Sequence, residues 1–255
     1  MLDRLSRLYD GYVDTFRDAS GALPVLMQLK LEHTGKVVEN AGLIADGEAF
    51  RADVRRAALA TALLHDTGRY EQLRLYNTFR DSESVDHAVF SRDIVREKGW
   101  LEAVGFNAKT AAAILDAVLY HNRRDVPEDL DDLTLACSHT VRDADKLDIF
   151  RVLEDRVENT DWRRDSRAFW NLRPDAPPSP KVVECIESRR PVDYQEIKTL
   201  ADFVLIQVGW MISGLYYPVS RRICRERGHL EFRRRFLHEL TDSSDVDRLC
   251  DMVPA

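Results

Sequence analysis

Apolar residues recur at three- and four-residue spacing along most of the chain, and no other feature of the sequence constrains the fold as strongly. Strict alternation of apolar and polar residues, which would indicate β-strands, is hard to find. The sequence therefore predicts an all-α fold. The segments with helical periodicity are 3–18, 24–45, 50–66, 85–98, 107–121, 131–158, 193–214 and 229–240.

A proline-rich stretch, "NLRPDAPPSP" at 171–180, interrupts this helical pattern. Proline is poorly tolerated inside a helix, so the stretch predicts a break between two helical parts. We expect a helical domain at 1–160, with its core at about 25–155, and a C-terminal helical extension at 161–255. The extension is rich in aromatic residues, and we expect it to pack on the first domain.

Composition excludes some classes of partner. The formal net charge is −7, and affinity for a nucleic acid polymer is built from clustered Lys and Arg, so such a polymer is not expected. A small anionic substrate needs only a few local cations and remains compatible with the sequence. No uninterrupted apolar run approaches the roughly 18 residues of a membrane span, so we expect no membrane association. A homo-oligomer remains open.

The cysteines and the N-terminus point to the cytoplasm. The four cysteines are scattered and form no CxxC pair, as is usual for reduced thiols. The N-terminal "MLDRLSRLYDGYVD" carries charges from residue 3 onward and does not read as a signal peptide.

Several polar side chains lie on helix faces that should point into the core. The apolar run "ATALLHDTGRYEQ" at 60–72 ends in an adjacent histidine and aspartate, although burial of an unpaired carboxylate is costly. Four further polar residues align with apolar residues three or four positions away on their own helices. The inward-facing set is His33, His65, Asp66, His87, His121 and Asp145.

Taken together, these residues predict a metal site. A single histidine on an apolar face is more often an ordinary core residue, but four histidines and two aspartates would make a poor core. Helical bundles commonly collect imidazoles and carboxylates from several helices around a metal. No thiolate joins the set, which favours one or two divalent ions of Mn, Fe, Ni, Co or Mg over structural zinc.

The same residues resemble the ligands of a known family. "LLHDTGR" at 63–69 is similar to the HD-x-G-K signature of the HD superfamily of metal-dependent phosphohydrolases, with Arg69 where lysine is usual. "VRDADKLD" at 141–148 resembles the late segment that supplies the last ligand, and "VDHA" and "YHN" resemble the additional histidines of binuclear members. The resemblance covers roughly 25–155 and implies an HD-domain helical bundle.

The resemblance also implies roles for individual residues. Asp66 would bridge two ions, one bound by His33, His65 and Asp145 and the other by His87 and His121, and a metal-activated water would be the nucleophile. Because adjacent residues diverge by about 100° on a helix, both members of the pair can reach one centre only if the helix ends there, and we assign that break to Gly68.

Cations near the motifs are candidates for substrate binding. Arg69 would act in catalysis beside Asp66 and would bind the substrate, with Arg123 and Lys146 as further substrate-binding candidates. Asp148 is expected to accept a hydrogen bond from a ligand rather than to bind metal, and Asp143 and Asp86 are weaker candidates for that role.

Three functions fit these residues. We favour a phosphohydrolase, either phosphomonoesterase or phosphodiesterase, acting on a nucleotide or small phosphorylated metabolite. A diiron oxygenase with the same ligand set is an alternative, because ligand order does not separate it from a hydrolase. A metal-binding module without catalysis is the third.

Overall fold

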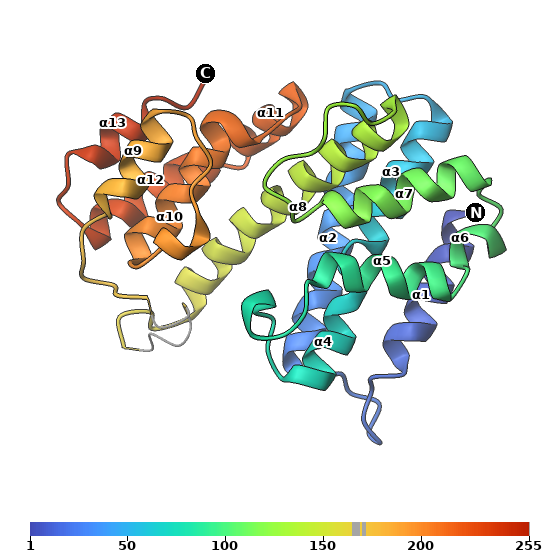
Figure 1. Ribbon diagram of the computed structural model, residues 1–255. Helices are drawn as coiled ribbons and strands as arrows, with labels where there is room; N and C mark the ends of the chain where they lie inside the picture. The colour runs from blue at the N-terminus through green and yellow to red at the C-terminus, as the bar shows by residue number, and fades with distance from the viewer. Residues whose placement is uncertain (165–168, 170–171, 255) are drawn as a thin grey trace. The chain divides into compact units, whose positions relative to one another are not determined.

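The chain is built from helices, as Figure 1 shows. The computed structural model describes residues 1–164, 169 and 172–254. Within these residues there is no β-strand, and an isolated bridge joins Arg173 to Thr199. The predicted all-α fold is confirmed. In the same residues, no helix combines the length and apolar character needed to cross a membrane.

The chain divides into two compact units, Met1–Asp145 and Lys146–Ala255, and the division falls within the long helix α8 (Asp132–Asn159). The predicted domain boundary near residue 160 and the predicted packing of the extension stay predictions. The first unit also contains α1 (Leu2–Asp14), α2 (Val25–Gly47), α3 (Ala52–Leu64), α4 (Gly68–Tyr76), the short helix η1 (Asp81–Glu83), α5 (His87–Glu97), α6 (Trp100–Ala103) and α7 (Ala108–Tyr120). The second contains α9 (Pro180–Glu187), η3 (Tyr194–Glu196), α10 (Leu200–Gly209), the π-helical turn η4 (Trp210–Gly214), α11 (Pro218–Glu226), α12 (His229–Leu240) and α13 (Asp245–Cys250).

Helix α3 is the central helix of the first unit. It is packed by α1, α2 and α7, and it is buried from Ala57 through Ala62. The buried side chains of this stretch are mostly alanines, which allow neighbouring backbones to come close because each side chain is only a methyl group. The C-terminal end of α3 therefore lies inside the helical bundle, and the residues that follow it are buried as well.

Capping chemistry divides the segment predicted as a single helix at 193–214. Thr199 and Asp202 form a capping box, in which the Thr199 hydroxyl accepts from the Asp202 N–H at 3.0 Å and the Asp202 carboxylate accepts from the Thr199 N–H at 3.0 Å. Helix α10 therefore begins at Leu200, after the separate short helix η3.

The proline-rich stretch behaves as predicted at three of its prolines and differently at the fourth. Pro174, Pro177 and Pro178 lie outside helices, whereas Pro180 is the first residue of α9. The first helical residue has no intrahelical partner for its N–H, so proline is tolerated there. Asn171, the first residue of the stretch, lies outside the described residues.

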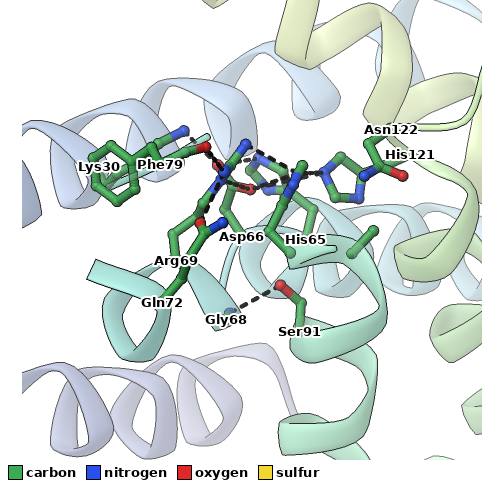
Figure 2. Close-up of polar contacts among 12 residues, drawn as sticks. Lys30, His65, Asp66, Gly68, Arg69, Gln72, Phe79, Ser91, His121 and Asn122 are labelled. Carbon is green, nitrogen blue, oxygen red and sulfur yellow. Dashed lines mark hydrogen bonds and ion pairs between the residues drawn. The ribbon is translucent and has the colours of Figure 1, made fainter. Parts of the chain in front are cut away.

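A close approach of α4 to α5 depends on Gly68, the first residue of α4. The Gly68 N–H donates to the Ser91 hydroxyl at 2.8 Å, as Figure 2 shows. A Cβ at this position would lie 2.7 Å from the Ser91 backbone nitrogen and 3.0 Å from the carbonyl oxygen of His87. Real Cβ atoms do not approach backbone atoms so closely, so only glycine fits between these helices.

We expect Gly68→Ala to destabilise the protein by about 3 kcal/mol, because the added methyl group must push α4 and α5 apart. Urea unfolding followed by circular dichroism measures the change. Gly11→Ala, in α1, is the matched control: nothing lies within 4 Å of its Cβ position, and alanine there should stabilise by up to about 1 kcal/mol. Equal effects of the two changes would show that the close approach does not limit stability.

A fully buried arginine organises the second unit. Arg233, on α12, is 0% exposed. Its guanidinium donates to Glu154 Oε1 at 2.6 Å, to Gln207 Oε1 at 2.8 Å and to the carbonyl of Phe150 at 2.8 Å. His229 Nδ1 donates to the same Glu154 oxygen at 2.6 Å. Burial opposes ionisation of Glu154, but its bonds to His229 and Arg233 hold the pKa of that carboxyl below its ordinary value.

We expect Glu154→Ala to destabilise the second unit by about 3–5 kcal/mol, because it leaves the buried Arg233 charge without its carboxylate. The midpoint of urea unfolding reports the effect. Glu184→Ala is the control, because Glu184 is an exposed residue of α9 that pairs with Lys181 and with Arg190 beyond the helix, and its loss should change stability by less than about 1 kcal/mol. A loss at Glu154 no larger than at Glu184 would contradict the role assigned to the buried pair.

Candidate metal centre

The adjacent residues His65 and Asp66 lie in a tight turn between α3 and α4. Helix α3 ends at Leu64, residues 65–67 form the turn, and α4 begins at Gly68. The helix therefore breaks before Gly68, and the prediction that Gly68 supplies the break is wrong, since Gly68 instead allows α4 to approach α5. His65 is 0% exposed and Asp66 4% exposed, and His65 Nε2 lies 3.5 Å from Asp66 Oδ2.

A first triad of possible ligands consists of His33, His65 and Asp66, whose ligand atoms all lie within 4.8 Å of one another. His33, from α2, places Nε2 3.8 Å from Asp66 Oδ2. Asp145, from α8, is outside this triad but adjoins it, because its Oδ1 lies 3.1 Å from His33 Nε2.

A second triad consists of Asp66, His87 and His121. His87 opens α5 and His121 follows α7, and their Nε2 atoms lie 3.5 and 3.7 Å from Asp66 Oδ1. Asp66 is thus shared: Oδ2 faces the first triad and Oδ1 faces the second. The structure brings five of the predicted ligands into two triads and places the sixth, Asp145, beside them.

The other ring nitrogens fix the tautomers of three of these histidines. Nδ1 of His65 lies 2.8 Å from the carbonyl of Ala62, and Nδ1 of His121 lies 2.7 Å from that of Val118. Carbonyls only accept hydrogen bonds, so both Nδ1 atoms carry the proton and both Nε2 atoms carry a lone pair. His87 Nδ1 donates to Asp81 Oδ2 at 2.5 Å, which leaves its Nε2 unprotonated as well.

The Nε2 lone pairs of His87 and His121 lie close together, with no proton between them. His87 Nε2 and His121 Nε2 are 3.1 Å apart, close to the roughly 3 Å between two nitrogens that each lie about 2.1 Å from one metal at a right angle. His65 Nε2 and Asp66 Oδ1 are buried without a hydrogen-bond partner. Acceptors so arranged fit a cation, and the two triads could hold divalent metal.

Burial keeps His65 and His87 neutral, and Lys30 keeps the Asp66 carboxylate ionised. Desolvation lowers the pKa of His65 and of His87 to about 4. Burial by itself would raise the pKa of Asp66, but the charge of Lys30 holds that pKa well below its ordinary value. At neutral pH these residues are therefore unprotonated ligands, as metal binding requires.

The structure adds two residues that the sequence analysis missed. Lys30, three residues before His33 on α2, places Nζ 2.5 Å from Asp66 Oδ2 (Figure 2). Asp81, in η1, accepts from His87 Nδ1 and also from Gln72 Nε2 at 3.0 Å. Burial opposes its ionisation, but the hydrogen bond from His87 and the charge of Arg69 lower the pKa of Asp81 to about 2. Lys30 shares a helix face with His33, a signal that could have identified it, whereas Asp81 follows no helical period.

Arg69 lies beside the centre and is held by the protein. Its Nη1 donates to the carbonyl of Phe79 at 2.6 Å and to Asp81 Oδ1 at 3.0 Å, and its Nη2 donates to His87 Nε2 at 3.2 Å. Its Nε lies 3.5 Å from Asp66 Oδ1. The side chain is 14% exposed, so little of it reaches solvent.

The remaining predicted residues have other immediate partners. Arg123 pairs with Asp86 at 2.5 Å, and Asp86 also caps α5 by accepting from the Ala88 N–H. Asp148, in the second unit, pairs with Arg151 at 2.6 Å. Lys146 also belongs to the second unit, and Asp143 is buried in α8.

Comparison with known proteins agrees with this geometry. Residues 31–149 match the family model described as the HD domain, and the match spans the six predicted ligands. No curated protein and no solved structure matches the chain. HD domains bind divalent metals, and the two triads supply residues for that purpose. Residues 31–149 of this chain therefore match an HD domain, which is consistent with the HD superfamily of metal-dependent phosphohydrolases.

Proposed function

We propose that the chain is a metal-dependent phosphohydrolase with two ions at its centre, acting on a nucleotide or a small phosphorylated metabolite. The observation that carries the proposal is the sharing of the buried Asp66 carboxylate by two triads, one oxygen to each. A shared carboxylate between two pairs of imidazoles is the arrangement that a pair of divalent ions needs.

Each of the two triads would bind one ion. His33, His65 and Asp66, with Asp145 adjoining, would hold one ion, and Asp66, His87 and His121 would hold the other. Bound divalent ions supply an activated water and polarise a phosphoryl oxygen. The chain itself orients the ligands: the carbonyls of Ala62 and Val118 and the carboxylate of Asp81 fix the ring nitrogens that face the centre.

Charge favours an anionic substrate. The ligand set contributes two carboxylates, Asp66 and Asp145, while two divalent ions contribute four positive charges. Lys30 and Arg69 add two positive charges beside the centre, and Asp81 adds one negative charge. The filled centre would therefore carry a positive charge, which a phosphoryl group can neutralise.

Arg69 and Arg123 are proposed to contact the substrate. Each guanidinium now pairs with a carboxylate, Arg69 with Asp81 and Arg123 with Asp86. A phosphate oxygen would have to join or replace these partners. Lys146 remains a further candidate from the sequence alone.

The proposed function is tested by the metal content of the protein purified without chelator, followed by assays on phosphorylated metabolites with Mn²⁺ and with Fe²⁺. We expect divalent metal in the purified protein and release of phosphate or a phosphomonoester that stops when a chelator removes the metal. Iron with substrate-dependent consumption of dioxygen would indicate the oxygenase alternative. Bound metal without turnover on any substrate would indicate a binding module.

We expect Asp66→Asn to lower turnover by at least about 100-fold and to reduce the metal bound per chain, because both triads lose their shared charged ligand. Helix content should be retained, since asparagine has nearly the same shape. Elemental analysis, circular dichroism and initial rates measure the three quantities.

The control for that change is Asp53→Asn, in the exposed first turn of α3, which should leave metal content and turnover unchanged. A well-folded Asp66→Asn protein with full metal content and full activity would contradict the proposed centre.

A further inference from the structure

Lys30 forms an unusual contact for a residue so close to a metal centre. Its ammonium lies 2.5 Å from Asp66 Oδ2, the oxygen that faces the first triad. Figure 2 shows Lys30 reaching Asp66 from α2, beside Phe79. The contact therefore uses an oxygen that an ion held by His33, His65 and Asp66 would also need.

The contact has a clear physical cause. Asp66 is 4% exposed, and a buried carboxylate requires a cation or several hydrogen-bond donors. Lys30 supplies that cation to Oδ2, while Arg69 Nε lies 3.5 Å from Oδ1. The ammonium of Lys30 thus neutralises the charge that a metal ion would otherwise neutralise.

Lys30 and Arg69 differ in how firmly they are held. The guanidinium of Arg69 donates to Gln72, Phe79 and Asp81 in addition to its contacts at the centre. Lys30 has a single carboxylate partner among the described residues, a flexible four-carbon stem and a side chain that is 21% exposed. Lys30 therefore has fewer polar contacts to break than Arg69 when it leaves Asp66.

We propose that Lys30 exchanges partners: it binds Asp66 in the metal-free protein and binds the anionic group of the substrate once metal occupies the first triad. The proposal rests on the metal centre of the proposed function. A divalent ion and an ammonium that share one carboxylate oxygen repel each other, so metal binding displaces Lys30. The freed ammonium then lies beside the centre and needs an anion, which a phosphoryl group provides.

The exchange couples the two ligands. Metal binding frees Lys30 for the anion, and by thermodynamic reciprocity the anion must raise the affinity for metal by the same factor. Without an anion, Lys30 competes with the metal and weakens its binding. Lys30 therefore makes retention of metal depend on the presence of a phosphorylated ligand.

The test uses isothermal titration of the full-length, chelator-treated protein with Mn²⁺, with and without inorganic phosphate at a concentration that does not precipitate the metal. In the unsubstituted protein, phosphate should raise Mn²⁺ affinity at least about 5-fold. Lys30→Met should bind Mn²⁺ about 10-fold tighter than the unsubstituted protein without phosphate, because the competing ammonium is gone, and phosphate should then have little effect.

Matched variants keep this test decisive. Lys36→Met removes an exposed lysine from the same helix and should behave as the unsubstituted protein. Lys30→Gln keeps a hydrogen-bond donor for Asp66 without the charge, and it should reproduce Lys30→Met even if that variant folds poorly.

Two outcomes separate failure of this proposal from failure of the proposed function. If the unsubstituted protein binds Mn²⁺ but the Lys30 variants show the same affinity and the same phosphate effect, the partner exchange is wrong and the metal centre stands. If the unsubstituted protein and the Lys30 variants all bind no metal, the centre itself is wrong and the exchange fails with it.

Discussion

The carboxylate of Asp66 is the charge around which the first unit is arranged. It is buried, and each of its oxygens faces imidazole nitrogens from different helices. A charge in such a place is stable only when cations or donors surround it. Lys30 from α2 and Arg69 from α4 meet this need in the structure, and the same position suits a divalent ion. The alanine-rich helix α3 and Gly68 matter because they bring this carboxylate into the middle of the bundle.

Helical periodicity predicts much of the first unit because its helices each bury one clear face. The predicted segments 24–45, 107–121 and 131–158 correspond to α2, α7 and α8 within about two residues at each end. The short helices α4, α9, α11 and α13 are absent from the prediction, since helices of six to nine residues give too few periods to detect. Pro180 and Pro218 also conceal two of them, because proline at the first helical position looks like a helix breaker in a sequence.

Helical periodicity also made the candidate ligands predictable, because each is a polar residue on a helix face or helix end that points inward. Lys30 and Asp81 were not found by this reasoning, and the cause differs between them. Lys30 lies on the expected face of α2, but a long side chain on a helix is ordinarily solvated, and its partner Asp66 lies in the turn between α3 and α4. Asp81 belongs to the segment between α4 and α5, where no period indicates direction. Tertiary contacts alone reveal a residue such as Asp81.

The two triads are supported in different ways, and this difference bears on how the centre assembles. His65 and His121 are oriented by carbonyls of their own helices, so their positions follow from helix packing. His87 is oriented by Asp81, which is itself held by Gln72 and Arg69. A carboxylate behind an imidazole makes its other nitrogen a stronger donor to metal than a carbonyl does. The second triad therefore contains the strongest histidine ligand, His87. The orientation of His87 depends on Asp81, which lies in the short segment between α4 and α5. The first triad is instead positioned by α2, α3 and the turn that follows α3. Once the helical bundle has folded, the first triad therefore needs less ordering of connecting segments than the second triad does.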